Sequence, residues 1–177
     1  ETNYTIVDVS DTEYYGIPRI FIDTEKHQLI IDRTTEIPAK MRIYGEDTTQ
    51  FVEYSLTIRG RGNTSWGAPK KNYKIELDNK APLLGMPQNK DWVLIPNYAD
   101  KTLLKNSLAF LLSEKLGVYY TPRSDFVELY LNGEYVGVYL LCEKIKQGAN
   151  RIDLPSDSLS FIVEIDYKAR EGEVVVN

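Results

Sequence analysis

The stretch that decides the predicted fold is EYSLTIRGRGNTSWGAPKKNYKIELD, residues 53–78. Apolar residues alternate with polar ones before Arg59, and they alternate again after Asn72 through Tyr73, Ile75 and Leu77. A period of two is typical of strands that bury one face. The stretch therefore predicts two strands of an antiparallel sheet, with a basic, glycine-punctuated segment between them.

Working outward, the same alternation predicts further strands at 19–23, 29–31, 39–44, 92–95 and 161–165, with breaks at Pro82, Gly85 and Pro87. Asn132-Gly133 separates two strand-like runs, 126–131 and 134–141, and is a strong signal for a hairpin turn. Residues 170–173 resemble a turn, and Val174 to Val176 begin another strand.

One helix is predicted, over about residues 100–116, with Asp100 at its amino-terminal cap and Gly117 just past its end. The leucine stripe of this helix has three- and four-residue spacing and predicts a core face; it consists of Leu104, Leu108, Leu111, Leu112 and Leu116. Strands outnumber helices, so the predicted class is α+β and rich in antiparallel sheet.

Composition limits the kinds of protein that this chain can be. It has 177 residues, a formal net charge of −5, one cysteine (Cys142) and one histidine (His27). The negative charge argues against bulk attraction to nucleic acid or anionic membrane. One Cys and one His exclude a disulfide framework and a Cys/His zinc cluster, and Cys142 is expected to be a buried small hydrophobe.

No apolar run reaches the roughly 20 residues of a membrane span. The low cysteine count fits the bacterial exterior and the cytoplasm equally well, whereas the thirteen tyrosines, with many Thr and Asn, favour a secreted or cell-surface bacterial protein.

The segment from Arg59 to Lys74 predicts a site for an anion. Five of its sixteen residues are basic, and Arg59 and Arg61 point to the same side of an extended chain. Two guanidinium groups can close on one phosphate, glycines let the backbone approach it, and Asn63 and Trp66 add a neutral donor and a flat face. The alternative is a solvated hairpin. The segment is neither a P-loop nor a dinucleotide fingerprint.

The other candidate residues are lysines and acids. Lys70, Lys71 and Lys74 lie near the start of a strand, from which a lysine can reach a nucleotide phosphate, or they form a charged outer face. Glu143 follows an apolar strand and could pair with such a lysine. Glu164 and Asp166 lie two apart and could hold Mg²⁺, or they form the solvated face of an edge strand.

Four blocks, in order, resemble the CotH kinase family, bacterial proteins named from a spore-coat member. They are RGRGNTSW with PKKNYK (59–74), LGM with DWVL (84–94), DKTLLKN (100–106), and LNGEYVGVY with EKI (131–145). Position 105 is Lys, where the family more often has Arg. The resemblance implies an atypical protein-kinase-like fold, here its amino-terminal lobe, with ATP, a divalent metal such as Mg²⁺ and transfer of phosphate to a protein hydroxyl.

On that basis, residues 51–177 are expected to form the kinase-like domain, truncated on its carboxyl-terminal side, with residues 1–50 as a β-rich segment packed on it. The resemblance implies that Arg59, Arg61, Asn63, Trp66 and Lys70 belong to the nucleotide-phosphate site. It also makes Lys71, Lys74 and Glu143 catalytic candidates, among them a lysine–acid pair.

Because the family continues past the hairpin, the chain as given is expected to bind nucleotide but to transfer no phosphate by itself. The alternatives are a non-catalytic module that binds an anionic glycan, and a structural coat or adhesion protein.

Overall fold

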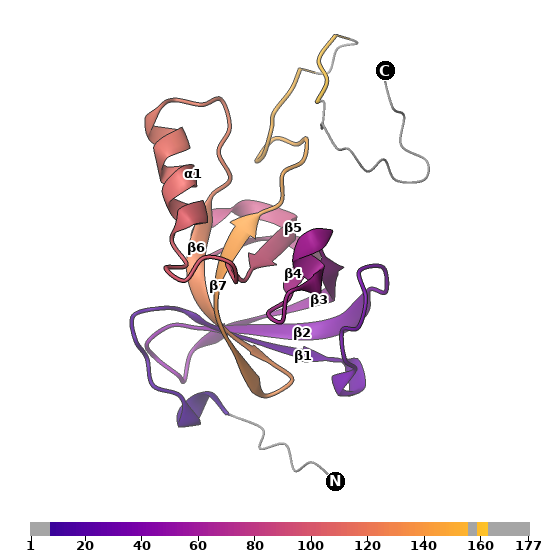
Figure 1. Cartoon of the computed structure of the whole chain (residues 1–177). Helices are drawn as coiled ribbons and strands as arrows, with labels where there is room; N and C mark the ends of the chain where they lie inside the picture. The colour runs from indigo at the N-terminus through magenta and orange to yellow at the C-terminus, as the bar shows by residue number, and fades with distance from the viewer. Residues whose placement is uncertain (1–7, 156–158, 163–177) are drawn as a thin grey trace.

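The structure is a computed structural model that describes residues 8–155 and 159–162. In this part of the chain, seven strands close into a barrel in the order β1-β2-β3-β4-β5-β7-β6 (Figure 1). The strands are β1 (Arg19–Thr24), β2 (Ile37–Tyr44), β3 (Phe51–Arg61), β4 (Asn72–Leu83), β5 (Met86–Ile95), β6 (Ser124–Leu131) and β7 (Glu134–Glu143). Neighbours pair antiparallel, except that β1 and β6 pair in parallel and close the barrel.

This barrel corrects the predicted fold class. The expected α+β, kinase-like amino-terminal lobe with one main helix is wrong, because the strands form a closed barrel and the α-helix is short. Closure depends on pairing Arg19 with Glu128, which lie far apart in the sequence. Local alternation identifies each strand but carries no information on such a distant partner.

The barrel interior is filled by the alternating apolar positions of all its strands. The predicted face Tyr73, Ile75 and Leu77 is buried, and Trp92 is fully buried. The sequence predicted a break in the chain between the strand that begins at Asn72 and the strand at 92–95. The structure has a tight β4–β5 hairpin turn there, at Leu84 and Gly85, which both have positive φ. The flanking strands are longer than predicted for this reason.

Other expected elements have mixed outcomes. The hairpin at Asn132-Gly133 is confirmed, and both residues have the positive φ that a type I′ turn needs. The strand at 29–31 is wrong, because these residues form a loop. Phe161 and Ile162 lie in no strand, whereas residues 163–165, the turn at 170–173 and the strand at 174–176 lie outside the described residues.

The helical elements are α1 (Lys105–Lys115) and three 3-10 turns, η1 (Val9–Asp11), η2 (Glu25–His27) and η3 (Thr64–Gly67). Helix α1 projects from one end of the barrel (Figure 1), and none of its residues is buried. The leucine stripe predicted as core is at least 51 % exposed at every position, so that prediction is wrong. The three- and four-residue spacing correctly places the leucines on one face of a helix. It does not show whether other residues pack against that face.

Candidate functional site

The basic segment forms the end of β3, the η3 turn and the start of β4. Gly60 is buried inside this connection, where a Cβ atom would lie 2.4 Å from the Trp66 ring and 2.5 Å from the carbonyl oxygen of Asp32. Arg33 donates to the Gly62 carbonyl at 2.8 Å and to Oδ1 of Asn63 at 3.0 Å. Because Gly60 has no side chain, the Trp66 ring and the Asp32 carbonyl can pack closely against its backbone.

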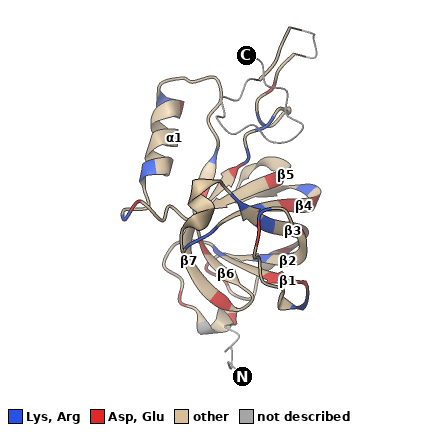
Figure 2. Ribbon diagram, turned by 45° about the vertical axis from the view of Figure 1, so that its right-hand side comes forward, with Lys and Arg blue, Asp and Glu red and all other residues tan. Residues whose placement is uncertain are grey.

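Arg59 and Lys74 lie opposite each other on the outer face of β3 and β4. Arg59 Nε is 3.4 Å from Glu36, and Lys74 Nζ is 2.6 Å from Glu76, 3.5 Å from Glu36 and 3.7 Å from Asp91. Burial opposes the charge of Lys74, but the hydrogen bond and charge of Glu76, with the other two acids, raise its pKa. Figure 2 shows basic and acidic residues gathered together on the side formed by β3, β4 and β5. Arg61 lies opposite Asn72 in the same pair of strands.

Glu143 is fully buried at the end of β7, and its carboxylate accepts hydrogen bonds from arginines instead of a lysine. Arg151 Nη1 donates to Oε1 at 2.6 Å, and Arg123 donates to Oε1 through Nε and to Oε2 through its backbone amide, each at 3.0 Å. Tyr120 donates to Oε2 at 3.0 Å. Arg151 also stacks over the Trp92 ring at 4.9 Å. The catalytic role of Glu143 stays a prediction.

Lys70 and Lys71 follow the η3 turn and point to different partners. Lys71 Nζ donates to the Trp66 carbonyl at 2.9 Å and lies 5.1 Å from the centre of the Trp66 ring. Lys70 Nζ donates to the Val138 carbonyl and lies 4.4 Å from the centre of the Tyr139 ring. Burial lowers the pKa of Lys70.

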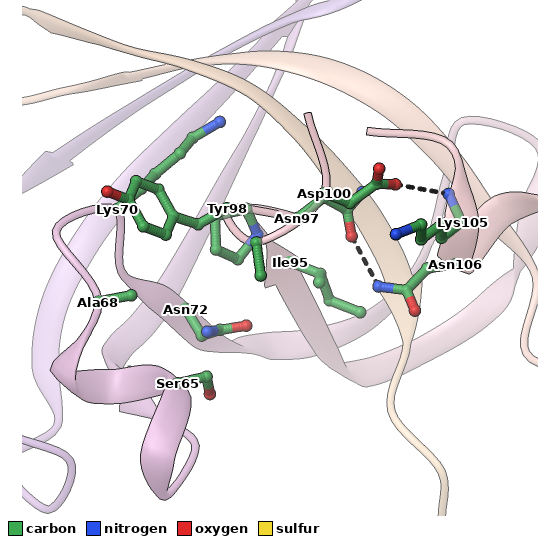
Figure 3. A pocket seen from close by; sticks show the side chains of 12 residues that line it. Ser65, Ala68, Lys70, Asn72, Ile95, Asn97, Tyr98, Asp100, Lys105 and Asn106 are labelled. Atoms are coloured by element: carbon green, nitrogen blue, oxygen red, sulfur yellow. Dashed lines mark hydrogen bonds between the residues drawn. The ribbon is translucent and has the colours of Figure 1, made fainter. Parts of the chain in front are cut away.

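A cavity of about 370 Å³ lies between the η3 turn, the ends of β4 and β5, and the start of α1 (Figure 3). Of the predicted site residues, Lys70 lines this cavity, while Arg59, Arg61, Asn63, Trp66, Lys71, Lys74 and Glu143 do not. Its other lining residues are Ser65, Ala68, Asn72, Ile95, Pro96, Asn97, Tyr98, Ala99, Asp100, Lys105 and Asn106. Lys105 thus brings a second cation to the cavity, from the wall opposite Ser65 and Asn72 (Figure 3).

The start of α1 is held in place by side-chain hydrogen bonds. Asp100 accepts from the backbone amide of Lys105 at 2.8 Å, but it is not the predicted N-cap, because α1 begins at Lys105 and its N-cap residue is Leu104. These bonds, the one from Lys105 first and then those from Thr102, lower the pKa of Asp100. Asn97 donates to the Leu103 carbonyl at 2.8 Å and accepts from Asn106 at 2.6 Å. These bonds hold together the part of the cavity wall that residues 97–106 form.

Sequence reasoning missed Asn72, Asn97, Tyr98, Lys105 and Asn106 as cavity residues. Two signals were available: Asn72 lies within the basic segment, and Lys105 and Asn106 end the block DKTLLKN. Neither carries a chemical pattern of its own, because amides and a single lysine are common on any surface. Only the fold brings the residues together.

No group of three or more His, Cys, Asp or Glu residues that could hold a metal occurs among residues 8–155 and 159–162. Glu164 and Asp166, the predicted Mg²⁺ candidates, lie outside those ranges. Cys142 is buried as predicted, and burial, with the nearby charge of Glu143, raises the pKa of its thiol to about 12. This pKa makes Cys142 an unreactive core residue at neutral pH.

The fold and the cavity define a small β-barrel domain with a ligand cavity lined by two lysines and several amides. The chain belongs to the CotH kinase family, since the family model described as CotH kinase protein matches residues 58–171. The resemblance seen in the four sequence blocks is thus confirmed. A comparison with curated proteins gave no match. Among the helices that the structure describes, none is long and apolar enough to cross a membrane.

Proposed function

We propose that this chain binds the phosphates of ATP, for transfer to a protein hydroxyl, as part of a CotH-type kinase. The observation that supports this proposal is the cavity in which the basic, glycine-punctuated connection meets the start of α1. Lys70 and Lys105 come to it from opposite walls, and its volume of about 370 Å³ lies within the usual range of small-molecule pockets.

The chemistry required of such a site is positioning and charge. A phosphoryl transition state spreads negative charge over its oxygens, and preorganised cations and amide donors stabilise it. Lys70 is held by the Val138 carbonyl and the Tyr139 ring, so its ammonium is fixed in advance. Partial burial makes each of its interactions stronger than in water.

Mg²⁺ fits this cavity only as a partner of the nucleotide. Asp100 is the one acid among the lining residues, and Mg²⁺ is commonly held by one or two carboxylates together with substrate phosphates. When bound, the ion would offset the charge of the phosphates, while Asp100 would supply a protein oxygen. The roles of Lys71, Lys74 and Glu143 in transfer are further predictions, as is that of the neighbouring Arg59–Arg61 pair.

Binding of ATP is tested by calorimetric titration in the presence of Mg²⁺. Replacing Lys70 by Met removes one charge-assisted bond, worth about 1.5–3 kcal/mol, so ATP affinity should fall roughly 10- to 150-fold. Lys80→Met is the matched control, because Lys80 is an exposed lysine of β4 away from the cavity, and it should leave affinity unchanged.

Wild-type affinity in both Lys70→Met and Lys105→Met would refute the cavity as the phosphate site. Binding of an acidic glycan, without any affinity for ATP, would instead favour the glycan module.

A further inference from the structure

Asn72, the first residue of β4, carries an amide that the fold leaves unused. The residue is 6 % exposed and lines the cavity, and its side chain points into it (Figure 3). Within the described part of the chain, its side-chain amide makes no hydrogen bond. The other two cavity asparagines differ, because Asn97 and Asn106 bond to each other and Asn97 also bonds to the Leu103 carbonyl.

The Asn72 amide is available to a ligand, because it faces the cavity and no side chain or backbone group of the described residues bonds to it. Its donor and acceptor are not among the fully buried atoms that lack a partner, so in the cavity they can bond to water, and a ligand that displaces this water has to offer the same bonds. A site that hydrogen-bonds a ligand through such a group discriminates against a ligand that cannot make these bonds. Asn72 lines the cavity on the same side as Ser65 (Figure 3), and this position points to a ligand group beside the phosphates.

The chemistry of the amide points to a planar group with a donor beside an acceptor. An asparagine side chain offers one donor and one acceptor in one plane, which matches the edge of adenine, where an exocyclic NH₂ lies beside a ring nitrogen. The corresponding major-groove edge of guanine presents two acceptors, so the amide oxygen would face another acceptor. Ile95, Pro96 and the half-exposed Tyr98 ring give the base apolar surface to lie against.

We propose that Asn72 reads the nucleobase and makes this site select adenine over guanine nucleotides. This inference rests on the proposed ATP site and adds the base specificity of that site. A bidentate contact of this kind discriminates by about 1–3 kcal/mol, which is roughly a 5- to 150-fold preference for ATP over GTP.

The test compares ATP, GTP and inorganic tripolyphosphate by calorimetric titration on the wild-type chain and on Asn72→Leu. The leucine has a similar shape but no amide. It should lower ATP affinity to the level of GTP and leave tripolyphosphate affinity unchanged. Asn79→Leu, on an exposed position of the same strand, is the matched control and should keep the wild-type preference. Asn72→Ala serves as the second variant if the leucine does not fold.

Thermal melting without ligand separates a recognition role from a structural one. If Asn72 serves a ligand, Asn72→Leu should melt at about the wild-type temperature, because the amide that it removes makes no hydrogen bond to the described residues. A lower melting temperature together with a retained ATP preference would overturn the inference, as would a wild-type protein that binds ATP and GTP equally.

The two proposals fail in different ways. If none of the three ligands binds, both the phosphate site and the recognition of the base by Asn72 are refuted. Binding of all three ligands that weakens in Lys70→Met, but shows no base preference dependent on Asn72, refutes the inference on Asn72 alone.

Discussion

Replacing Glu143 by Gln tests whether this acid holds the barrel end together. The substitution keeps the shape of the side chain but removes its charge. The Glu143 carboxylate accepts four hydrogen bonds, and it is buried together with Arg151, whose Nε and Nη2 already have no hydrogen-bond partner among the described residues. With Gln, the amide NH₂ would face the backbone N–H of Arg123, or else an arginine nitrogen.

The expected cost follows from the burial of both partners. Breaking a fully buried ion pair and leaving one charge uncompensated costs about 3–5 kcal/mol. For a chain of this size, each kcal/mol shifts the melting temperature by about 2–4 °C, so the expected drop is roughly 6–20 °C. The measurement is urea unfolding at neutral pH, checked by calorimetric melting.

Glu76→Gln is the matched control. Its side chain is 40 % exposed, and its pair with Lys74 should contribute at most about 1 kcal/mol. Adding Arg151→Met to Glu143→Gln should restore part of the lost stability, because the uncompensated buried charge is then removed. A loss in Glu143→Gln no larger than in the control would refute the structural role of this network.

Two further changes test other parts of the structure. Gly60→Ala should lower the free energy of unfolding by about 1–3 kcal/mol, because its Cβ would collide with Trp66 and the Asp32 carbonyl, while Gly67→Ala, with open space around it, should change little in the same urea titration. Asp91→Asn should destabilise the protein above pH 4, because burial opposes the charge of Asp91 but its lysine partners lower its pKa below 3.8. A carboxylate with a lowered pKa contributes stability that is lost as pH falls through that pKa, so the melting curves of wild type and variant should converge in acid. A difference that grew in acid would contradict this assignment.

Much of the strand pattern was predictable, because each strand carries its own alternation. Ile75 and Leu77 reveal the inner face of β4, and Asn132-Gly133 reveals a hairpin without reference to the rest of the chain. The barrel was not predictable in the same way, since its closure depends on which distant strand pairs with β1. The burial of α1 was not predictable either. Helical spacing shows that its leucines share one face, but it does not show whether other residues cover that face.

The candidate site was predictable only in part, for a related reason. The basic segment was located correctly, but its charges divide between two places. Lys70 reaches the cavity, whereas Arg59 and Lys74 are engaged with acids on the outer face of the barrel. Those acids include Glu36 and Asp91, which come from other strands or loops. Counting basic residues along a segment therefore overestimates the charge available to one ligand.

The parallel pair of β1 and β6 has a consequence for how the chain folds. Four complete strands lie between these two in the sequence, so their pairing closes a very long loop. Local hairpins such as β4–β5 and β6–β7 can form early, but the seam between β1 and β6 can form only after β6 has left the ribosome. Closing distant contacts carries a large entropic cost and slows folding. Until that seam closes, β1 and β6 both present free edges to other chains, so the nascent protein should be most prone to aggregation at this stage.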